Sequence, residues 1–472
     1  MTAAPAPAPA PAPPPAKPVV TRPTRRGAEL FMIFFAIVLA IGVSGTITAA
    51  TDKHLDGKPL MYGAVLLVMF GVAHVVVRIY AKYADPLILP LAAALNGIGV
   101  AFIYRLDLAH TKSHWDYASH QLMWTAIGIV GFVAVLVLLR DHKTLSRYAY
   151  TLGFGGLGLL AIPALLPASM STVNGSKLWI RAGAFSIQPG EFAKLALMVF
   201  FAAYLVAKRD VLSLASKRVM GIDLPRPRDL GPVLIAWLAS VGVLVLEKDL
   251  GSSLLFFGMF VVMLYVATER TSWLLIGLAL FVGGAFVAWT LFAHVQERVT
   301  IWLDPWKDYK GTGYQIAQAQ FSLGSGGLLG KGPGSGRPQL LLGEANSDFI
   351  TATIAEELGL FGLTAILIMY LLIVQRGLRT ALTVRDPFGK LLAGGLAFTL
   401  GLQVFVIVGG VTRLIPLTGL TTPFLAQGGS SLVANWMLVA VLLRISDAAR
   451  RPAPPPAAPP PLANQQTQVV SR

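Results

Sequence analysis

The 472-residue sequence contains no cysteine, and it has few charged residues for its length. Without cysteine the chain can form no disulfide, offers no thiolate nucleophile and cannot bind a metal through sulfur. Charged residues make up 13% of the chain and hydrophobic residues 55%, with a mean hydropathy of +0.67. This composition excludes an ordinary soluble protein. The seven histidines are dispersed, with no spacing typical of a metal site.

Long hydrophobic runs dominate the sequence. A helix that crosses a bilayer needs about 20 mostly apolar residues. About twelve such stretches lie near 29–50, 60–80, 85–105, 121–140, 146–168, 190–207, 230–246, 251–268, 272–292, 349–374, 390–411 and 428–445. The first exceeds the ~7–15 residues of a signal-peptide core, which favours an uncleaved helix. The sequence predicts an all-α polytopic membrane protein with about twelve transmembrane helices.

The net charge of +15 reports membrane orientation rather than nucleic-acid binding. If the N-terminus is cytoplasmic and the stretches alternate, most of the 38 Lys and Arg residues fall in cytoplasmic segments. This distribution obeys the positive-inside rule. We therefore expect a multi-pass protein of the cytoplasmic (inner) membrane, with both termini in the cytoplasm.

Composition divides the chain into one membrane region and two tails. Residues 1–27 and 448–472 are rich in Pro and Ala, which predicts disordered cytoplasmic tails that act as tethers rather than as partner-binding motifs. Residues 28–447 form the predicted transmembrane domain, with a large outer loop at 293–348. The basic loop 208–229 is predicted to lie against anionic lipid headgroups.

That outer loop is the one long polar excursion among the predicted spans. Loops longer than about 12–15 residues are usually functional or disordered. This loop is too aromatic and too poor in Pro and Ser to indicate disorder. Its ionisable residues either pair in solvent or form a site shaped by the surrounding aromatic and glycine residues; they are Asp304, Lys307, Asp308, Lys310, Lys331, Arg337, Glu344 and Asp348.

The glycine-rich stretch 324–336 resembles a phosphate-binding loop in composition but does not match the P-loop sequence pattern. Ser325 stands where the first glycine is required, and Gly332 replaces the Ser or Thr that should follow Lys331. The stretch is also predicted to face away from cytoplasmic ATP. We expect it to be flexible backbone that covers a site.

Three further groups of charges lie next to or within apolar stretches. Glu191 and Lys194 share a helix face, so they form either a local ion pair or part of a functional site. Residues 247–249 carry three charges and form either a tight outer turn or the lining of a cavity. Glu356 and Glu357 lie inside the tenth stretch, where they pair with a cation or serve function.

Taken in order, several motifs resemble the SEDS family of RodA/FtsW-type peptidoglycan glycosyltransferases. The matching pieces are Lys177 to Arg181 with Phe185 to Lys194, Glu247 to Gly251, Asp308 to Gln315, Asp348 to Ile350 with Ala355 to Gly359, Pro416 to Leu420, and Gln427 to Ser431. They span roughly residues 85–447, and the combination of about twelve spans with a Pro-rich tail resembles the actinobacterial RodA-like branch. The family core has ten spans, so the first two helices would be additional.

The resemblance implies an enzyme that polymerises lipid II into glycan strands at the outer membrane face during cell-wall elongation. Undecaprenyl pyrophosphate is the leaving group. The family's essential acidic residue maps to Asp308, which would act as general base, with Asp304 as the alternative. The sequence departs from the family at Tyr309 and Lys248, which replace prolines, and at Gln427, which replaces a tyrosine.

The resemblance also implies how substrate is held and which partner binds. Lys177, Arg181 and Lys194 are expected to stabilise the pyrophosphate. The full set predicted to bind substrate is Lys177, Arg181, Glu191, Lys194, Asp304, Lys331 and Asp348. No cofactor is certain, and a divalent cation, Mg²⁺ or Mn²⁺, is left open. The implied partner is a class B penicillin-binding protein, a transpeptidase.

Rival functions stay open at this point. A lipid-linked precursor flippase would also have about twelve spans with buried charges, although no inverted repeat is detected. A division-specific FtsW-type polymerase and a non-enzymatic scaffold for the transpeptidase are further alternatives. A transporter should hold its charges near the midplane of the membrane, whereas the densest cluster here lies in the predicted outer loop.

Overall fold

The computed structural model describes residues 24–452, apart from 52–56, 110–115, 174–175, 183–184, 342–344 and most of 211–246. Within this part of the chain, ten helices are long and apolar enough to cross a membrane. They are α1 (Arg26–Thr51), α2 (Lys58–Tyr80), α3 (Ile88–Ala109), α4 (Tyr117–Leu138), α8 (Pro189–Ala207), α11 (Leu250–Thr268), α12 (Ser272–Leu291), α15 (Ile350–Thr383), α16 (Pro387–Val411) and α17 (Gly429–Arg450). The prediction of a polytopic helical membrane protein is confirmed.

Two of the predicted spans differ from this set. The stretch at 146–168 forms α6 (Ala149–Leu165), a shorter apolar helix that contains Pro163. The stretch at 230–246 lies largely outside the described residues, as do the basic loop 208–229 and nearly all of both tails.

Burial separates the helices into a centre and a periphery. In α3, 94% of the most apolar window is buried, whereas in α12 only 6% is. A helix that is apolar on every side yet mostly exposed suits contact with lipid. At the centre, Trp436 of α17 is fully buried and donates to the amide oxygen of Asn96 on α3 at 3.2 Å. Its ring packs directly on Gly128 of α4, where a larger side chain would not fit.

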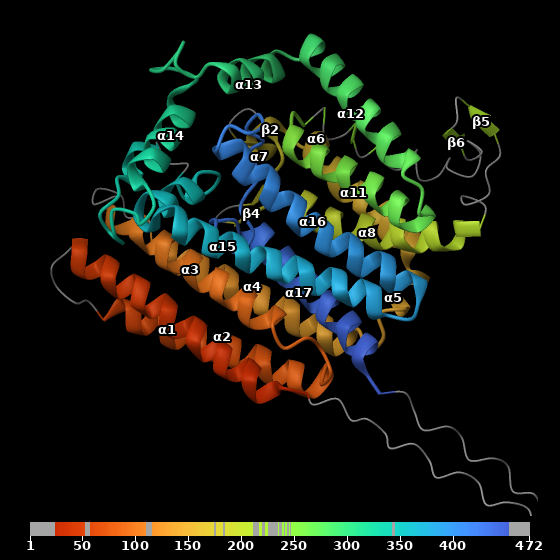
Figure 1. Cartoon of the computed structure of the whole chain (residues 1–472), viewed down its shortest axis with the longest axis horizontal. Helices are drawn as coiled ribbons and strands as arrows, with labels where there is room; N and C mark the ends of the chain where they lie inside the picture. Colours follow the sequence, from red (N-terminus) through yellow and green to blue (C-terminus); the bar gives the residue numbers. More distant parts are fainter. Residues whose placement is uncertain are drawn as a thin grey trace, which may run out of the picture.

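The two ends of the helix bundle carry different short elements. At one end lies α5 (Thr144–Arg147), and at the other lie α7 (Ala168–Ser171) and the long connection between α12 and α15 (Figure 1). Three short antiparallel hairpins pair β1 (Thr172–Val173) with β2 (Ser176–Lys177), β3 (Ile180–Ala182) with β4 (Phe185–Ile187), and β5 (Lys217–Val219) with β6 (Ile222–Leu224).

The connection between α12 and α15 contains two helices too short to span a bilayer. These are α13 (Ala293–Leu303) and α14 (Tyr314–Gly326), followed by the 3₁₀ turn η1 (Pro338–Leu341). The predicted long excursion therefore has defined structure. Its position outside the cytoplasm stays a prediction.

The glycine-rich segment is held in place by the two consecutive glutamates of α15. The Glu357 carboxylate accepts hydrogen bonds from Gly334 N (2.8 Å), Gly336 N (3.2 Å) and Arg105 Nε (2.8 Å). The Glu356 carboxylate pairs with Lys331 Nζ at 2.7 Å. Both glutamates therefore form ion pairs, Glu357 with Arg105 and Glu356 with Lys331. Pairing with a cation was one of the two alternatives that the sequence left open. We expected flexible cover here, and the segment instead packs at the kink of α15, where Gly359 has φ 68°.

Candidate functional site

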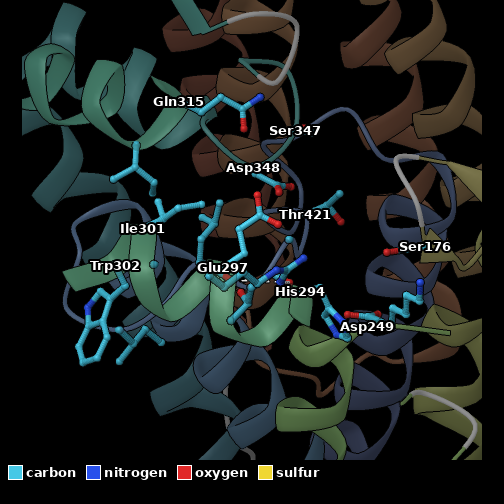
Figure 2. A pocket seen from close by; sticks show the side chains of 18 of the residues that line it. Ser176, Asp249, His294, Glu297, Ile301, Trp302, Gln315, Ser347, Asp348 and Thr421 are labelled. Atoms are coloured by element: carbon cyan, nitrogen blue, oxygen red, sulfur yellow. Dashed lines mark hydrogen bonds between the residues drawn. The ribbon is translucent and has the colours of Figure 1, made fainter. Parts of the chain in front are cut away.

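A cavity of about 700 Å³ lies beneath α13, at the end of the bundle that carries the excursion (Figure 2). Five parts of the chain that are distant in sequence line it: the segment 176–188, the turn 248–249, α13 with the start of α14, the pair Ser347 and Asp348, and residues 410–421. This volume lies within the range of about 300–1,000 Å³ that is typical of small-ligand sites. The cavity is therefore the candidate functional site.

Three side chains hold α13 and α14 over this cavity. Arg298 Nη1 donates to the carbonyls of Leu417 (3.1 Å) and Thr418 (2.9 Å). Gln320 Nε2 of α14 donates to the carbonyl of Val411 at 2.9 Å. At the end of α13, Arg413 donates to the carbonyls of Trp302 (3.0 Å from Nη2) and Leu303 (3.0 Å).

The contact between Arg413 and Trp302 is reciprocal. The Trp302 indole Nε1 donates to the backbone carbonyl of Arg413 at 3.0 Å. The guanidinium of Arg413 meets carbonyls at the C-terminal end of α13, where the helix dipole favours a cation. These contacts fix the end of α13, and therefore the start of the segment that carries Asp308, against the turn after α16.

Four basic side chains line the cavity: Lys248, His294, Arg298 and Arg413. Lys248 and Arg413 both have left-handed backbones, with φ of 64° and 61°. Non-glycine residues in this region are strained, and such strain concentrates at functional sites. The pKa of His294 is lowered, first by burial and then by Arg298 and Lys248. A lining of this kind suits an anionic ligand.

Carboxylates line the same cavity. They belong to Asp249, Glu297 and Asp348, and Figure 2 shows Glu297 of α13 and Asp348 directed into it. A side chain at Gly419, which has φ 78°, would contact both the Arg298 guanidinium and the Asp348 carboxylate. Asp249 caps α11 by accepting from Ser252 N at 3.1 Å, and burial raises its pKa. The cavity therefore combines groups that bind an anion with groups that can accept a proton.

Asp308 lies at the rim rather than inside the cavity. Its exposed carboxylate accepts from Thr312 N (2.9 Å) and Thr312 Oγ1 (3.0 Å), and Thr312 lines the cavity. These hydrogen bonds, first that of the Thr312 backbone, lower the pKa of Asp308. Asp308 is therefore ionised at neutral pH. It contacts the cavity lining through Thr312.

Glu191 and Lys194 form a buried ion pair at 2.8 Å, so the local pair is present. Lys194 Nζ also donates to Gln403 Oε1 at 3.0 Å, and Gln403 Nε2 donates to the carbonyl of Thr421 at 3.1 Å. Because Thr421 lines the cavity, the Gln403 side chain connects the Glu191–Lys194 pair to the cavity wall. Neither charged residue lines the cavity itself.

The other predicted substrate-binding residues are spread around this end of the molecule. Asp348 lines the cavity, whereas Lys177, Arg181, Asp304 and Lys331 do not. Lys177 lies on β2 beside the lining residues Ser176 and Leu178. Arg181 and Asp304 are exposed, and Lys331 is paired with Glu356. Of the predicted set, the structure therefore places only Asp348 directly in the cavity.

Sequence reasoning missed the cavity residues His294, Glu297, Arg298 and Arg413. The first three lie on α13, whose polar residues follow a long apolar run, and that change of composition was an available signal. Arg413 offered no local signal, because its role depends on a contact with a residue more than a hundred positions away. The turn 247–249 was recognised as a possible cavity lining, and Lys248 and Asp249 do line it.

The described residues contain no group of three or more His, Cys, Asp or Glu side chains that could hold a metal ion. Among these residues, the structure therefore does not identify a site for the divalent cation that the sequence left open. The carboxylates of Asp249, Glu297 and Asp348 line the cavity, but they do not form such a group.

Replacing Arg413 with Ala should loosen the end of α13. Hydrogen bonds to a charged group contribute about 1.5–3 kcal/mol, so we expect amides near 302–304 to exchange about tenfold faster or more. Hydrogen–deuterium exchange measured by mass spectrometry checks this, with Arg379→Ala on α15 as a control outside the cavity lining. Unchanged exchange in the peptide that contains Trp302 would show that Arg413 does not hold α13.

Glu247 should make folding stability depend on pH. Burial first, and then the nearby Asp249 carboxylate, raise its pKa from 4.5 to about 8. Because the folded protein holds this proton more tightly than the unfolded chain, the stabilising contribution is complete below about pH 4.5 and is lost as pH rises through about 8. We expect the wild-type unfolding temperature to fall across this upper range, and Glu247→Gln to reduce the fall. Parallel curves for the two proteins would refute this assignment.

Comparison with known proteins adds sequence and structural relatives. A family model of FtsW, RodA and SpoVE, described as cell cycle protein, matches residues 86–451. The chain is 52% identical over 433 residues to the peptidoglycan glycosyltransferase RodA of Mycobacterium tuberculosis (strain ATCC 25618 / H37Rv), covering 91% of this chain and 92% of the relative. Identity to RodA of Mycobacterium leprae is 49% over 443 residues, covering 92% and 94%.

A solved structure shares the fold. A chain from a peptidoglycan synthase complex, described for its coordination of polymerization and crosslinking, aligns with a TM-score of 0.62 at 26% identity. The alignment covers 78% of this chain and 99% of the other. Helices α1 and α2 precede the range matched by the family model, and the other eight span-length helices of the described residues lie within it.

Proposed function

Because this chain belongs to the FtsW, RodA and SpoVE family, we propose that the cavity beneath α13 is the site at which it polymerises lipid II into glycan strands. The chain is a peptidoglycan glycosyltransferase of the RodA type. Its 49–52% identity to proteins of that name supports a role in elongation. The observation that carries the placement is the cavity itself, where cations and carboxylates from four parts of the chain converge beside Asp308.

In the proposed reaction, Asp308 acts as general base. It takes the proton from the 4-hydroxyl of the incoming sugar as that oxygen attacks C1 of the second sugar with inversion. The new C1–O bond forms as the bond from C1 to the pyrophosphate oxygen breaks, and undecaprenyl pyrophosphate leaves. The ionised state of Asp308 and its hydrogen bonds to the cavity residue Thr312 support this role.

The cavity cations supply the electrostatic part of the mechanism. Arg298, Arg413 and Lys248 line the cavity and are the side chains best placed to stabilise charge on a pyrophosphate. Arg298 and Arg413 are already oriented by backbone carbonyls, so they need little rearrangement when the ligand arrives. Lys177 and Arg181, which the sequence nominated, are proposed to meet the lipid headgroup near the rim. Lys194 is proposed to support the wall through Gln403.

The orientation and the partner belong to the same proposal. A lipid-linked sugar with its headgroup outside the cell requires the cavity to face outward, with both termini in the cytoplasm. The similar solved chain comes from a peptidoglycan synthase complex. By that likeness we propose that this chain acts with a class B penicillin-binding protein that crosslinks the strands it makes.

Reconstitution with lipid II tests this function against the transporter alternative. Purified protein in liposomes, supplied with lipid II and analysed by gel electrophoresis, should produce glycan strands. Strand formation is measured both with and without the partner transpeptidase. Movement of lipid II between leaflets without any polymer, with or without the partner, would reject the polymerase and favour a flippase.

A further inference from the structure

Tyr309 and three other aromatic side chains of the excursion pack together. Ring centroids are 5.6 Å apart for Trp306 and Phe321, 6.4 Å for Trp306 and Tyr309, 6.2 Å for Tyr309 and Phe321, and 6.1 Å for Tyr309 and Tyr314. Tyr309 OH accepts from Gln318 Nε2 at 3.0 Å, which orients the central ring. The cluster thus joins the segment after α13 to α14 as one rigid unit.

This cluster is not a buried core. Trp306 is 48% exposed and Phe321 50% exposed, although both rings are large and apolar. Shortly after Phe321 the chain presents Leu328 and Leu329, of which Leu329 is 80% exposed. A group of exposed large apolar residues on one structured segment marks a surface that meets a partner or a membrane.

The structure connects this segment to the surface of a membrane-spanning helix. Leu360 N donates to the carbonyl of Gly327 at 2.9 Å, and Phe361 N donates to that of Leu328 at 3.1 Å. Leu360 and Phe361 belong to α15, one of the long apolar helices, and their side chains are exposed. Residues 327–329 therefore lie beside the apolar surface of α15, level with its kink at Gly359.

We propose that Trp306, Phe321, Leu328 and Leu329 form an interfacial anchor that inserts into the outer surface of the lipid bilayer. The contact of residues 327–329 with the apolar surface of α15 favours lipid as the occupant. The types of residue in the cluster also favour lipid. Trp and Tyr rings concentrate at the interface of membranes, and the exposed Lys307 beside them can reach lipid phosphates. A sugar polymer would stack on the aromatic rings but would leave the two leucines in water.

The anchor would fix the position of the excursion relative to the membrane. Through Trp306 it would hold the segment 304–312 at the level of the headgroups, beside the cavity that Thr312 lines. A lipid-linked substrate diffusing in the membrane would then arrive at the height of the cavity. The anchor itself does not depend on the proposed glycosyl transfer, because it rests only on exposed apolar surface and its connection to α15.

The absence of cysteine makes a direct depth measurement possible. Single cysteines placed by Trp306→Cys, Phe321→Cys and Leu329→Cys, each carrying a nitroxide, would be studied in liposomes of phosphatidylethanolamine and phosphatidylglycerol. Electron paramagnetic resonance compares relaxation by oxygen, which partitions into lipid, with relaxation by a water-soluble nickel chelate. Leu371→Cys on the exposed face of α15 gives the lipid reference, and Lys310→Cys gives the matched polar control.

We expect oxygen to relax the labels at 306, 321 and 329 more strongly than the nickel chelate, with the opposite order at Lys310→Cys. Agreement at two positions is needed, so that a single substitution that disturbs the cluster does not decide the result. Water-like accessibility at all three positions would overturn the anchor. Labels that are water-accessible until glycan strands are added would overturn it in favour of a saccharide platform.

Discussion

Replacing Asp308 with Asn should lower the rate of lipid II polymerisation by about 10²–10⁴-fold, the range that general-base assistance contributes. The side chain is exposed, and its amide oxygen can still accept the hydrogen bonds of Thr312, so folding should be preserved. The loss should appear in kcat, with little change in KM, because the base acts on the proton that moves only during the reaction. Initial rates with purified protein and lipid II provide the measurement.

Asp304→Asn is the matched control for that substitution. Asp304 is an exposed aspartate on the same segment, and it accepts a hydrogen bond from Trp306 N, whereas Asp308 accepts from the cavity residue Thr312. We expect its rate to stay within a few-fold of wild type. Full activity of Asp308→Asn would reject Asp308 as the base, and loss in Asp304→Asn alone would transfer the role to Asp304. Loss in neither would direct attention to Asp348 and Glu297 inside the cavity.

Replacing Lys194 with Met should destabilise the protein strongly. The substitution leaves the buried Glu191 carboxylate without its cation and removes the donor to Gln403. Breaking one partner of a buried pair costs about 3–5 kcal/mol, because an uncompensated charge stays behind. Thermal unfolding in detergent should show a lower transition temperature, and polymerisation should fall with it because Gln403 also holds Thr421.

The double substitution Glu191→Gln with Lys194→Met separates charge from packing. With both charges removed, most of the lost stability should return, because replacing a buried pair by uncharged groups is often close to neutral. If activity stays low while stability recovers, the pair also orients the cavity wall. A single Lys194→Met protein as stable as wild type would contradict the importance of the pair.

Most of the membrane helices could be predicted because one physical requirement dominates them. Each span must be about 20 residues long and apolar, and that requirement is visible in local composition. The boundaries were less accurate. Gly359 interrupts the regular backbone of α15 without ending it, and α15 continues to Thr383, beyond the predicted end at 374. The short helices α13 and α14 lie in a polar stretch that was predicted only as a loop.

The site was predicted less completely than the fold, because it depends on tertiary contacts. Asp348 was found because it sits in a recognised motif next to an apolar stretch. Lys194 was predicted to bind substrate, yet the structure pairs it with Glu191 and leaves the cavity to Arg298 and Arg413. Their guanidinium groups are oriented by backbone carbonyls at distant positions in the sequence, and the backbone of Arg413 is left-handed. No local sequence pattern indicates either feature.

Photo-crosslinking tests most directly whether the substrate binds in the cavity beneath α13. A lipid II analogue with a photoreactive group close to its pyrophosphate, irradiated with the protein and mapped by mass spectrometry, should mark the residues that surround the bound headgroup. We predict crosslinks on peptides from α13 and from residues 410–421, lost when excess unmodified lipid II competes. Specific crosslinks confined to other surfaces, with none on these two segments, would contradict the cavity beneath α13 as the active site.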